Sequence, residues 1–312
     1  ITTVKDTVRL TCTDNALTII VMLPARVEEE GQIVLKGRFL LDLVRTLPDG
    51  DVSLKTDERN NAVLTYGTSY VRMQGIPASE FPVPRILEQT EDTISVEQKK
   101  LKKMIAQTVF ATATTDMRPI LTGALFELDH HELSLVALDG FRLALCREYI
   151  EKDSGKASAV IPKRSLTEIG QLLDTVDETV YITIEESYMQ VYIGSTCVIT
   201  QLLAGDFVKY RKMIPSAHTT RVRMHTMLLA EAVRRASLIA KDGNHSLICF
   251  LIRQNMLKVT ANSERSNLDE VVPAEIEGNE LDIAFNARYI EDVLRVLDCD
   301  EFYFECTSST TQ

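Results

Sequence analysis

Apolar residues recur with helical spacing in three similar stretches of the chain, 36–47, 162–173 and 286–297. Repeats at i, i+3, i+4 and i+7 are typical of a helix with one apolar face. The predicted inward positions are Phe39, Leu40, Leu43, Leu47, Leu166, Ile169, Leu173, Ile290, Val293 and Leu297. The opposite face of each predicted helix carries an arginine, namely Arg38, Arg164 and Arg288. A similar amphipathic helix is therefore predicted about every 125 residues.

Alternation of apolar and polar residues follows each of these helices. The segments 52–56, 180–184 and 301–306 have the period of two that half-buried strands show. A second type of helix is predicted at 101–112 and 228–240, and each is followed by two further strand-like runs. The repeating unit is therefore helix, strands, helix, strands.

This unit predicts an α+β fold with three topologically similar domains, at 1–90, 91–215 and 216–312. A stacked solenoid is disfavoured because its units have roughly 20–50 residues, whereas units of this size bury cores of their own. The first unit begins without its first helix and the third is shorter than the second. We therefore expect the first domain to be incomplete at its N-terminal end and the third at its C-terminal end. Three such domains in a row favour an arc or a ring, because each junction reuses similar edges.

Charge is distributed unevenly between the predicted elements. The chain has 34 Lys and Arg against 45 Asp and Glu, a net charge of −11, which argues against a protein covered by nucleic acid. Acidic residues gather in the loop and strand segments 27–31, 88–92 and 274–282. The predicted helices instead add to their arginines the basic residues Lys99, Lys100, Lys102, Lys103, Lys163, Arg234 and Arg235. A cationic helical surface would touch phosphates without reading bases.

Composition places the chain among cytoplasmic globular proteins. No apolar run approaches the roughly 18–20 residues of a membrane helix, and no signal-peptide pattern opens the chain. The six cysteines form no CxxC pair and lie mostly in apolar surroundings. We therefore expect structural thiols, and neither disulfides nor a zinc site.

The sequence offers little support for any catalytic site. There is no Walker A loop, no GxGxxG and no HExxH motif. The run DHHE, residues 129–132, sits between two predicted strands, where a solvated hairpin tip is favoured over a metal site. Asp139 and Arg142 are interpreted as parts of a turn and not as an acid–base pair. We expect no catalytic residue, metal or cofactor, and a hydrolase or nuclease stays open as an alternative of a different class.

Several longer sequence segments resemble those of a known family, the bacterial DNA polymerase III beta subunit or sliding clamp. The resemblance covers nearly the whole chain and is carried by DMRPILTGALFE (116–127), ALDGFRLALC (137–146), LAGDFVKYRKMIP (203–215), LKVTANSE (257–264) and AFNARYIEDVL (284–294). It implies three clamp domains per chain, with helices lining the inside and antiparallel sheets outside. Two chains would pair head to tail into a closed homodimeric ring around duplex DNA.

The resemblance also implies partners for the ring. It would tether the replicative polymerase alpha subunit, the clamp loader, repair polymerases and mismatch-repair proteins through short peptide motifs. The chain would then be a cytoplasmic, non-catalytic member of a holoenzyme that has polymerase and 3′–5′ exonuclease activity. A peptide-binding scaffold that does not encircle DNA is the alternative.

A hydrophobic pocket for those peptides is implied between the second and third domains. The resemblance places it on Leu121, Leu138, Gly140, Phe141, Arg142, Leu143, Val208, Lys212, Met213, Asn286, Tyr289 and Thr310. The chain departs from the family at four of these positions. Leu138 replaces a threonine, Phe141 a histidine, Val208 a proline and Lys212 an arginine. We expect a more apolar pocket with an altered peptide preference.

For DNA, the resemblance points to Arg38 and to a loop that contains Thr115, Pro119 and Ile120. In the best-known member these three loop positions hold a glutamine and two tyrosines. Physical reasoning adds Lys102, Lys103 and Arg118 as donors on or beside a helix that would face the DNA. These seven residues form the predicted DNA-contacting set.

Overall fold

The computed structural model describes residues 1–115, 117–242 and 246–309. The chain divides into two compact units. Unit 1 consists of residues 1–105, 114–136 and 146–205, and unit 2 of 106–113, 137–145 and 206–312. In the parts of the chain that the structure describes, no helix is both long enough and apolar enough to cross a membrane.

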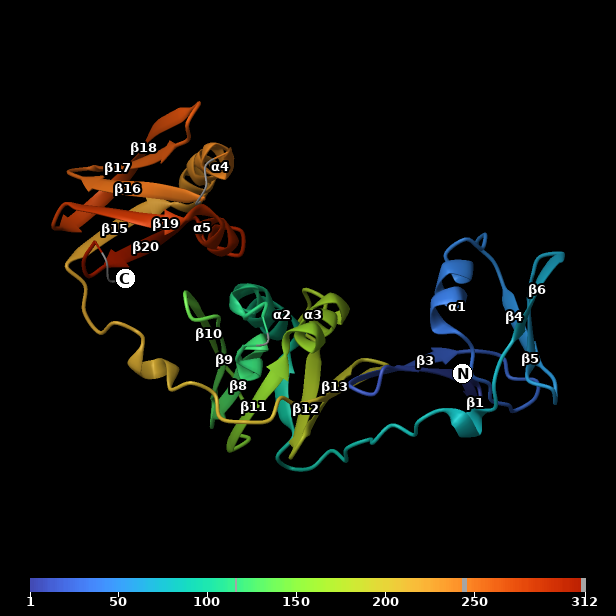
Figure 1. Cartoon of the computed structure of the whole chain (residues 1–312). Helices are drawn as coiled ribbons and strands as arrows, with labels where there is room; N and C mark the ends of the chain where they lie inside the picture. The colour runs from blue at the N-terminus through green and yellow to red at the C-terminus, as the bar shows by residue number, and fades with distance from the viewer. Residues whose placement is uncertain (116, 243–245, 310–312) are drawn as a thin grey trace. The chain divides into compact units, whose positions relative to one another are not determined.

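A seven-stranded antiparallel sheet joins the first two repeats within unit 1 (Figure 1). Its order is β1 (Thr2–Val4), β2 (Thr7–Thr13), β3 (Leu17–Pro24), β14 (Thr196–Gln201), β13 (Tyr188–Ile193), β12 (Thr179–Glu185) and β7 (Ile94–Glu97). The junction lies between β3 and β14, where Leu17 faces Thr200 and Val21 faces Thr196. Strands nearly 180 residues apart in the chain therefore form one continuous ladder.

Two smaller sheets complete the strands of these repeats. One has the order β4 (Val52–Thr56), β5 (Asn61–Tyr66) and β6 (Ser69–Gln74). The other has the order β10 (Leu143–Tyr149), β9 (Glu132–Leu138), β8 (Gly123–Asp129) and β11 (Lys156–Pro162). His130, with a φ of 58°, and His131 form the tight turn between β8 and β9, which confirms the predicted hairpin tip.

The helices form where the apolar periodicity predicts them. They are α1 (Gly37–Val44), α2 (Gln98–Thr108), α3 (Lys163–Leu172), α4 (Thr226–Asp242) and α5 (Ala287–Leu294). Short 3₁₀ turns occur at η1 (Ala78–Glu80), η2 (Val109–Ala111), η3 (Pro119–Thr122) and η4 (Tyr210–Lys212). In α3 the apolar stripe is fully inside, since Leu166, Ile169 and Leu173 are each 1% exposed.

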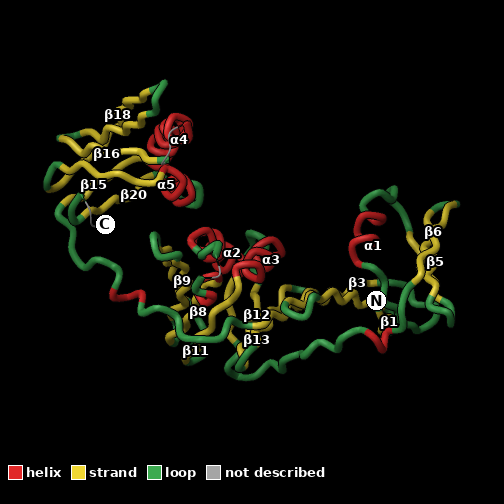
Figure 2. The backbone as a smooth tube through the Cα atoms, viewed as in Figure 1, coloured by secondary structure: helices red, strands yellow, loops and turns green. Residues whose placement is uncertain are grey.

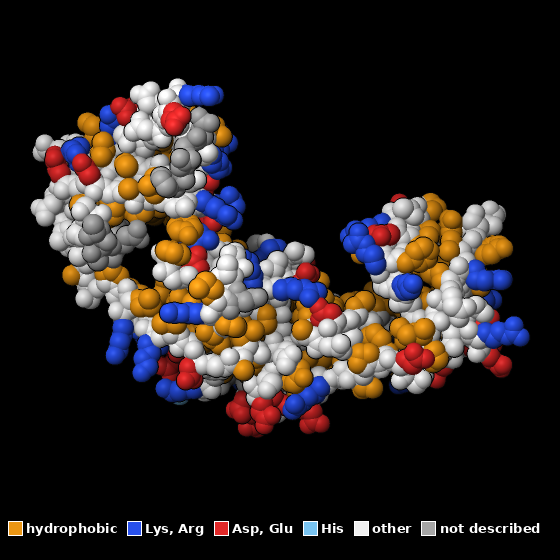
Figure 3. Space-filling model, viewed as in Figure 1, with side chains coloured by type: hydrophobic (Ala, Val, Ile, Leu, Met, Phe, Trp, Pro, Cys, Tyr) orange, Lys and Arg blue, Asp and Glu red, His pale blue; other side chains and the backbone are white. Residues whose placement is uncertain are grey.

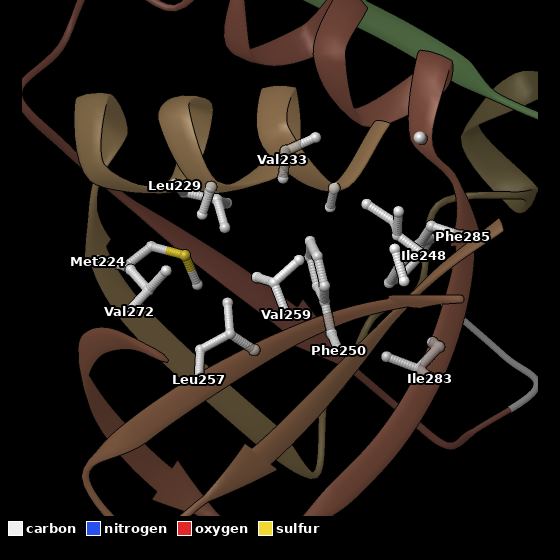
Figure 4. Close-up of a cluster of buried hydrophobic side chains, with 14 of the residues drawn as sticks. Met224, Leu229, Val233, Ile248, Phe250, Leu257, Val259, Val272, Ile283 and Phe285 are labelled. Carbon is white, nitrogen blue, oxygen red and sulfur yellow. The ribbon is translucent and has the colours of Figure 1, made fainter. Parts of the chain in front are cut away.

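Unit 2 is a two-layer structure of helices on a sheet (Figure 2). The sheet has the order β19 (Leu281–Asn286), β16 (Leu247–Arg253), β17 (Met256–Asn262), β18 (Asn267–Gly278), β15 (Thr220–His225) and β20 (Glu301–Cys306). Leu229 and Val233 of α4 point at Phe250, Leu257 and Val259 of the sheet (Figure 4). This buried cluster shows that the third repeat has a core of its own. Together with unit 1, it confirms the α+β class with antiparallel sheets.

Two predicted inward positions are wrong. Phe39 is 53% exposed, while Leu40, Leu43 and Leu47 pack against the core of the first repeat. On α5, Val293 is 40% exposed and Leu294 is the buried residue. Adjacent helical residues are separated by about 100°. A short helix can therefore turn either neighbour inward, and the packing decides between them.

All six cysteines lie in the described residues and none is in a disulfide, and Cys146, Cys197 and Cys306 are buried. Burial raises the pKa of both Cys197 and Cys306 to about 11, which makes them inert thiols. Cys12 and Cys299 are exposed and are the exceptions to the expectation that most of the cysteines lie in apolar surroundings. Both lie outside the packed cores, and the sequence pattern does not distinguish them from the buried cysteines.

Candidate functional site

A tight turn between β9 and β10 carries the centre of the predicted peptide pocket. Gly140 has a φ of 97°, a conformation that residues with a side chain rarely adopt. Asp139 Oδ1 accepts hydrogen bonds from the backbone N–H groups of Phe141 at 2.9 Å and Arg142 at 3.1 Å. This side-chain-to-backbone bonding fixes the turn. The ring of Phe141 is left 82% exposed.

Arg142 joins this turn to two other segments of unit 2. Its Nε donates to Asp139 Oδ2 at 3.1 Å, Nη1 to Asp292 Oδ2 at 2.8 Å and Nη2 to the Phe110 carbonyl at 2.8 Å. The guanidinium carbon also lies 4.4 Å from the Tyr289 ring centroid and 5.3 Å from that of Phe110. Charge-assisted bonds and cation–π contacts reinforce each other where solvent is excluded.

Helix α5 is held in place by further hydrogen bonds. Asn286 caps its N-terminus, and its Oδ1 accepts from the Arg288 backbone N–H at 3.0 Å. Gln107 of α2 donates from Nε2 to the Val296 carbonyl at 3.3 Å and to Asp298 Oδ1 at 3.4 Å. Segments from the second and third repeats therefore meet inside unit 2.

The segment after residue 205 supplies the remaining pocket positions of unit 2. Val208 is half-buried, whereas Lys212 and Met213 are exposed. Tyr210 is 2% exposed and anchors the segment, and the backbone N–H of Met213 donates to its carbonyl at 2.8 Å. The exposed side chains of Lys212 and Met213 thus project from a fixed turn.

The structure places ten of the twelve predicted pocket residues in unit 2. Of these, Arg142 and Tyr289 are in direct contact. The ten are Leu138, Gly140, Phe141, Arg142, Leu143, Val208, Lys212, Met213, Asn286 and Tyr289. Leu121 is 3% exposed within unit 1, and Thr310 lies outside the described residues. The pocket set as a whole stays a prediction.

Three contributors to this region were missed by sequence reasoning. Phe110, Asp292 and Gln107 hold the turn and α5 together. Asp292 has the outward helical spacing of a solvated residue, yet its side chain is only 14% exposed. The sequence did indicate that Asp139 and Arg142 belong to one turn. It did not indicate that Arg142 also contacts α5.

Lys and Arg side chains lie over α1 in unit 1 and over α4 and α5 in unit 2, each unit taken by itself (Figure 3). The side chain of Arg38 is 82% exposed and pairs with Asp42 one turn later at 3.1 Å. Arg234 is also exposed, whereas Arg235 is bound by Glu270. Exposed pairs of this kind are weak, so Arg38 can exchange Asp42 for a phosphate.

The two predicted lysines of α2 differ in their surroundings. Lys102 Nζ donates to the Leu173 carbonyl at 2.7 Å, at the C-terminal end of α3. Lys103 is exposed and lies 3.6 Å from Glu148. Lys102 therefore has a contact with a helix end, while the more exposed Lys103 lies beside Glu148. Of the loop positions, Thr115, Arg118 and Pro119 are exposed and Ile120 is half-buried.

Comparison with known proteins places the chain in a family. Residues 1–85, 95–209 and 211–312 match the N-terminal, central and C-terminal domains of the DNA polymerase III beta subunit. The beta sliding clamp of Staphylococcus aureus is 30% identical over 307 residues, which is 95% of this chain and 81% of the relative. A Staphylococcus epidermidis beta sliding clamp is 29% identical over 312 residues, with 96% and 82% covered.

Solved structures agree with the sequence relatives. The DNA polymerase sliding clamp of Bacillus subtilis has a TM-score of 0.94 and 30% identity, with 99% of this chain and 84% of that chain covered. The DNA polymerase III beta subunit of Thermotoga maritima has a TM-score of 0.90 and 27% identity, with the same coverage. The sequence segments that resemble the family, the repeated α+β fold and these matches together show that the chain belongs to the family of bacterial DNA polymerase III beta subunits, the beta sliding clamps.

Proposed function

We propose that this chain forms a ring around duplex DNA and tethers the replicative polymerase to its template. The observation that carries this function is the run of three consecutive matches to the beta-subunit domains along one α+β chain. A ring that encloses DNA retains it by topology, so tight binding is not required. The chain is a non-catalytic processivity subunit.

Contacts with DNA are proposed to be electrostatic and independent of sequence. Arg38 and Lys103 project from helices, and Arg118 from a loop, with side chains in solvent. Such side chains neutralise phosphates and release counterions, which makes binding weak and salt-dependent. Weak contacts of this kind allow the ring to slide.

Ring closure is proposed to need two chains, with the first domain of one against the third domain of the other. Strand β6 is an edge strand of its three-stranded sheet and therefore offers backbone groups to another strand. In unit 2, β15 pairs with residues 274–278 of β18, and β17 pairs with residues 267–273 of β18. The side of residues 267–273 that faces away from β17 is therefore not covered by β15. Addition of strand to strand between two chains would use these edges.

Partner proteins are proposed to dock short peptides at the turn of Phe141 and at α5. The replicative polymerase alpha subunit, the clamp loader, repair polymerases and mismatch-repair proteins are the proposed partners. An exposed aromatic ring beside a rigid, partly buried framework suits an apolar peptide side chain. The same surface would let these partners compete for one ring.

The test is retention on circular DNA. The chain is loaded on a nicked circular plasmid by a clamp loader with ATP, and the plasmid is then cut once. A clamp stays with the circle through gel filtration and is lost after the cut, because it slides off the new ends. Plasmid that is linear from the start serves as the control and should retain nothing.

Three outcomes would contradict the proposal. Equal retention on circles and on linear DNA would indicate ordinary binding. No retention, together with a monomeric mass by light scattering and intact peptide binding, would favour the scaffold. Cleavage of the plasmid in the presence of Mg²⁺ would reveal a nuclease.

A further inference from the structure

The guanidinium of Arg142 is committed to contacts within the protein. Each of its three nitrogens donates to an acceptor, namely Asp139, Asp292 and the Phe110 carbonyl, and two aromatic rings lie against it. Its side chain is only 16% exposed. A group in this state is poorly placed to bind a ligand carboxylate, because the existing bonds would have to be broken first. Arg142 therefore acts by holding segments in place.

What Arg142 holds is the turn that bears Phe141. Asp139 accepts the backbone N–H groups of Phe141 and Arg142 through Oδ1, and its other oxygen accepts from Arg142 Nε. The backbone at Phe141 is thus tied to the arginine, and the arginine is tied to α5 through Asp292. Breaking the link to Asp292 would remove the charge-assisted bond between the turn and α5, leaving the Tyr289 ring of α5 against Arg142, without removing any group from the turn itself.

Phe141 has 82% of its surface in solvent, although the backbone on which it sits is held by these contacts. A scattered exposed apolar side chain needs no explanation. This one differs because three elements fix its backbone: the turn, η2 and α5. A ring with two rotatable bonds on a fixed backbone loses little entropy when a ligand covers it. A second aromatic ring packed against it would add stabilisation beyond the area that it buries.

We propose that Asp292 is a positioning residue for peptide binding, because through Arg142 it fixes the turn on which Phe141 presents an aromatic surface to an aromatic side chain of a linear partner peptide. This inference rests on the proposed function, since it assigns a positioning residue to the same peptide-binding site. The local sequence around Asp292 does not indicate this role.

The test is a double-mutant cycle with two probe peptides. One fluorescent hexapeptide carries a single phenylalanine among aliphatic residues, and its counterpart carries alanine at that position. Both are titrated by fluorescence anisotropy with the full chain and with Phe141→Ala, Asp292→Asn and the double variant. Glu291→Gln removes a charge from the same helix and is the matched control. Thermal unfolding of every variant checks that it is folded.

Phe141→Ala should weaken binding of the phenylalanine peptide about three- to tenfold, because an aromatic pair is lost. The alanine peptide should be nearly unaffected. Asp292→Asn should weaken the phenylalanine peptide by a similar factor, and in that background Phe141→Ala should have little further effect. Asp292→Glu should restore part of the preference, while Glu291→Gln should match the parent chain.

The inference is overturned if Asp292→Asn binds both peptides as Glu291→Gln does, or if Phe141→Ala costs the same with and without Asp292. A general loss of stability would lower binding of both peptides equally and would also contradict a positioning role. If the parent chain binds neither peptide, peptide docking at this site falls together with the inference. If the parent binds and the variants do not differ from it, the inference alone falls.

Discussion

Lys102 donates from its ammonium group to the carbonyl oxygen of Leu173 over 2.7 Å. Leu173 follows the last residue of α3, where backbone carbonyls lack partners within the helix. A cation there is favoured both by the hydrogen bond and by the negative end of the helix dipole. Within unit 1, Lys102, one of the residues predicted to contact DNA, thus links α2 to α3.

Replacement of Lys102 by Met should therefore lower stability more than it lowers DNA binding. We expect a loss of about 1 kcal/mol in the free energy of unfolding, because a charge-assisted bond at a helix end disappears from a half-exposed site. Urea denaturation measures this change. Lys103→Met is the control, since its ammonium lies 3.6 Å from Glu148 and is exposed. Equal destabilisation by both variants would contradict the assignment.

Arg38 should contribute to DNA binding through its charge alone. Arg38→Ala should weaken binding of duplexes of any sequence and reduce the slope of log K against log salt by about one. Fluorescence anisotropy at several salt concentrations gives both quantities. Arg223→Ala provides the control, because Arg223 lies on strand β15 between Glu275 and Glu301. A sequence-dependent loss for Arg38→Ala, or an equal loss for Arg223→Ala, would count against this role.

Gln190 should be essential for holding the linker that follows the first repeat. Its side chain is fully buried, Oε1 accepts from the Leu87 N–H at 2.9 Å and Nε2 donates to the Leu87 carbonyl at 2.8 Å. Gln190→Leu leaves two buried backbone groups without partners and should cost about 2–4 kcal/mol. Gln190→Glu keeps an acceptor but loses the donor. Chemical denaturation and limited proteolysis near Leu87 should show increased susceptibility in both variants, and unchanged stability in Gln190→Leu would refute the prediction.

Acid should remove the stabilisation that Glu270 provides. The hydrogen bond from Arg235, which donates from Nε at 2.9 Å, lowers the pKa of Glu270 below its ordinary value of 4.5. The lowered pKa means that the stabilisation is present above the unfolded-state pKa and is lost as pH falls through the folded-state pKa. The difference in unfolding free energy between the parent and Glu270→Gln should therefore be constant at neutral pH and shrink below about pH 4.5. A difference that grows on acidification would have the wrong sign.

The positions of the helices and strands could be predicted because periodicity is a local property. The predicted segment 162–173, for example, contains α3 (Lys163–Leu172), and Leu166, Ile169 and the C-cap residue Leu173 are inside, as the spacing predicts. The boundaries of the three domains, at residues 90 and 215, remain a prediction. The pairing of β3 with β14 could not be foreseen, since edge strands carry no local mark of their partner.

The sequence by itself determined the repeated α+β unit, the five helices and the family, because each depends on the order and spacing of residues along the chain. Only the tertiary structure decided that Phe39 and Val293 face solvent, that Lys102 binds the end of α3, and that Asp292 meets Arg142. These contacts join residues far apart in the chain. Which of several similar charged or apolar side chains is buried depends on what the opposite element offers, and that information is absent from any local stretch of sequence.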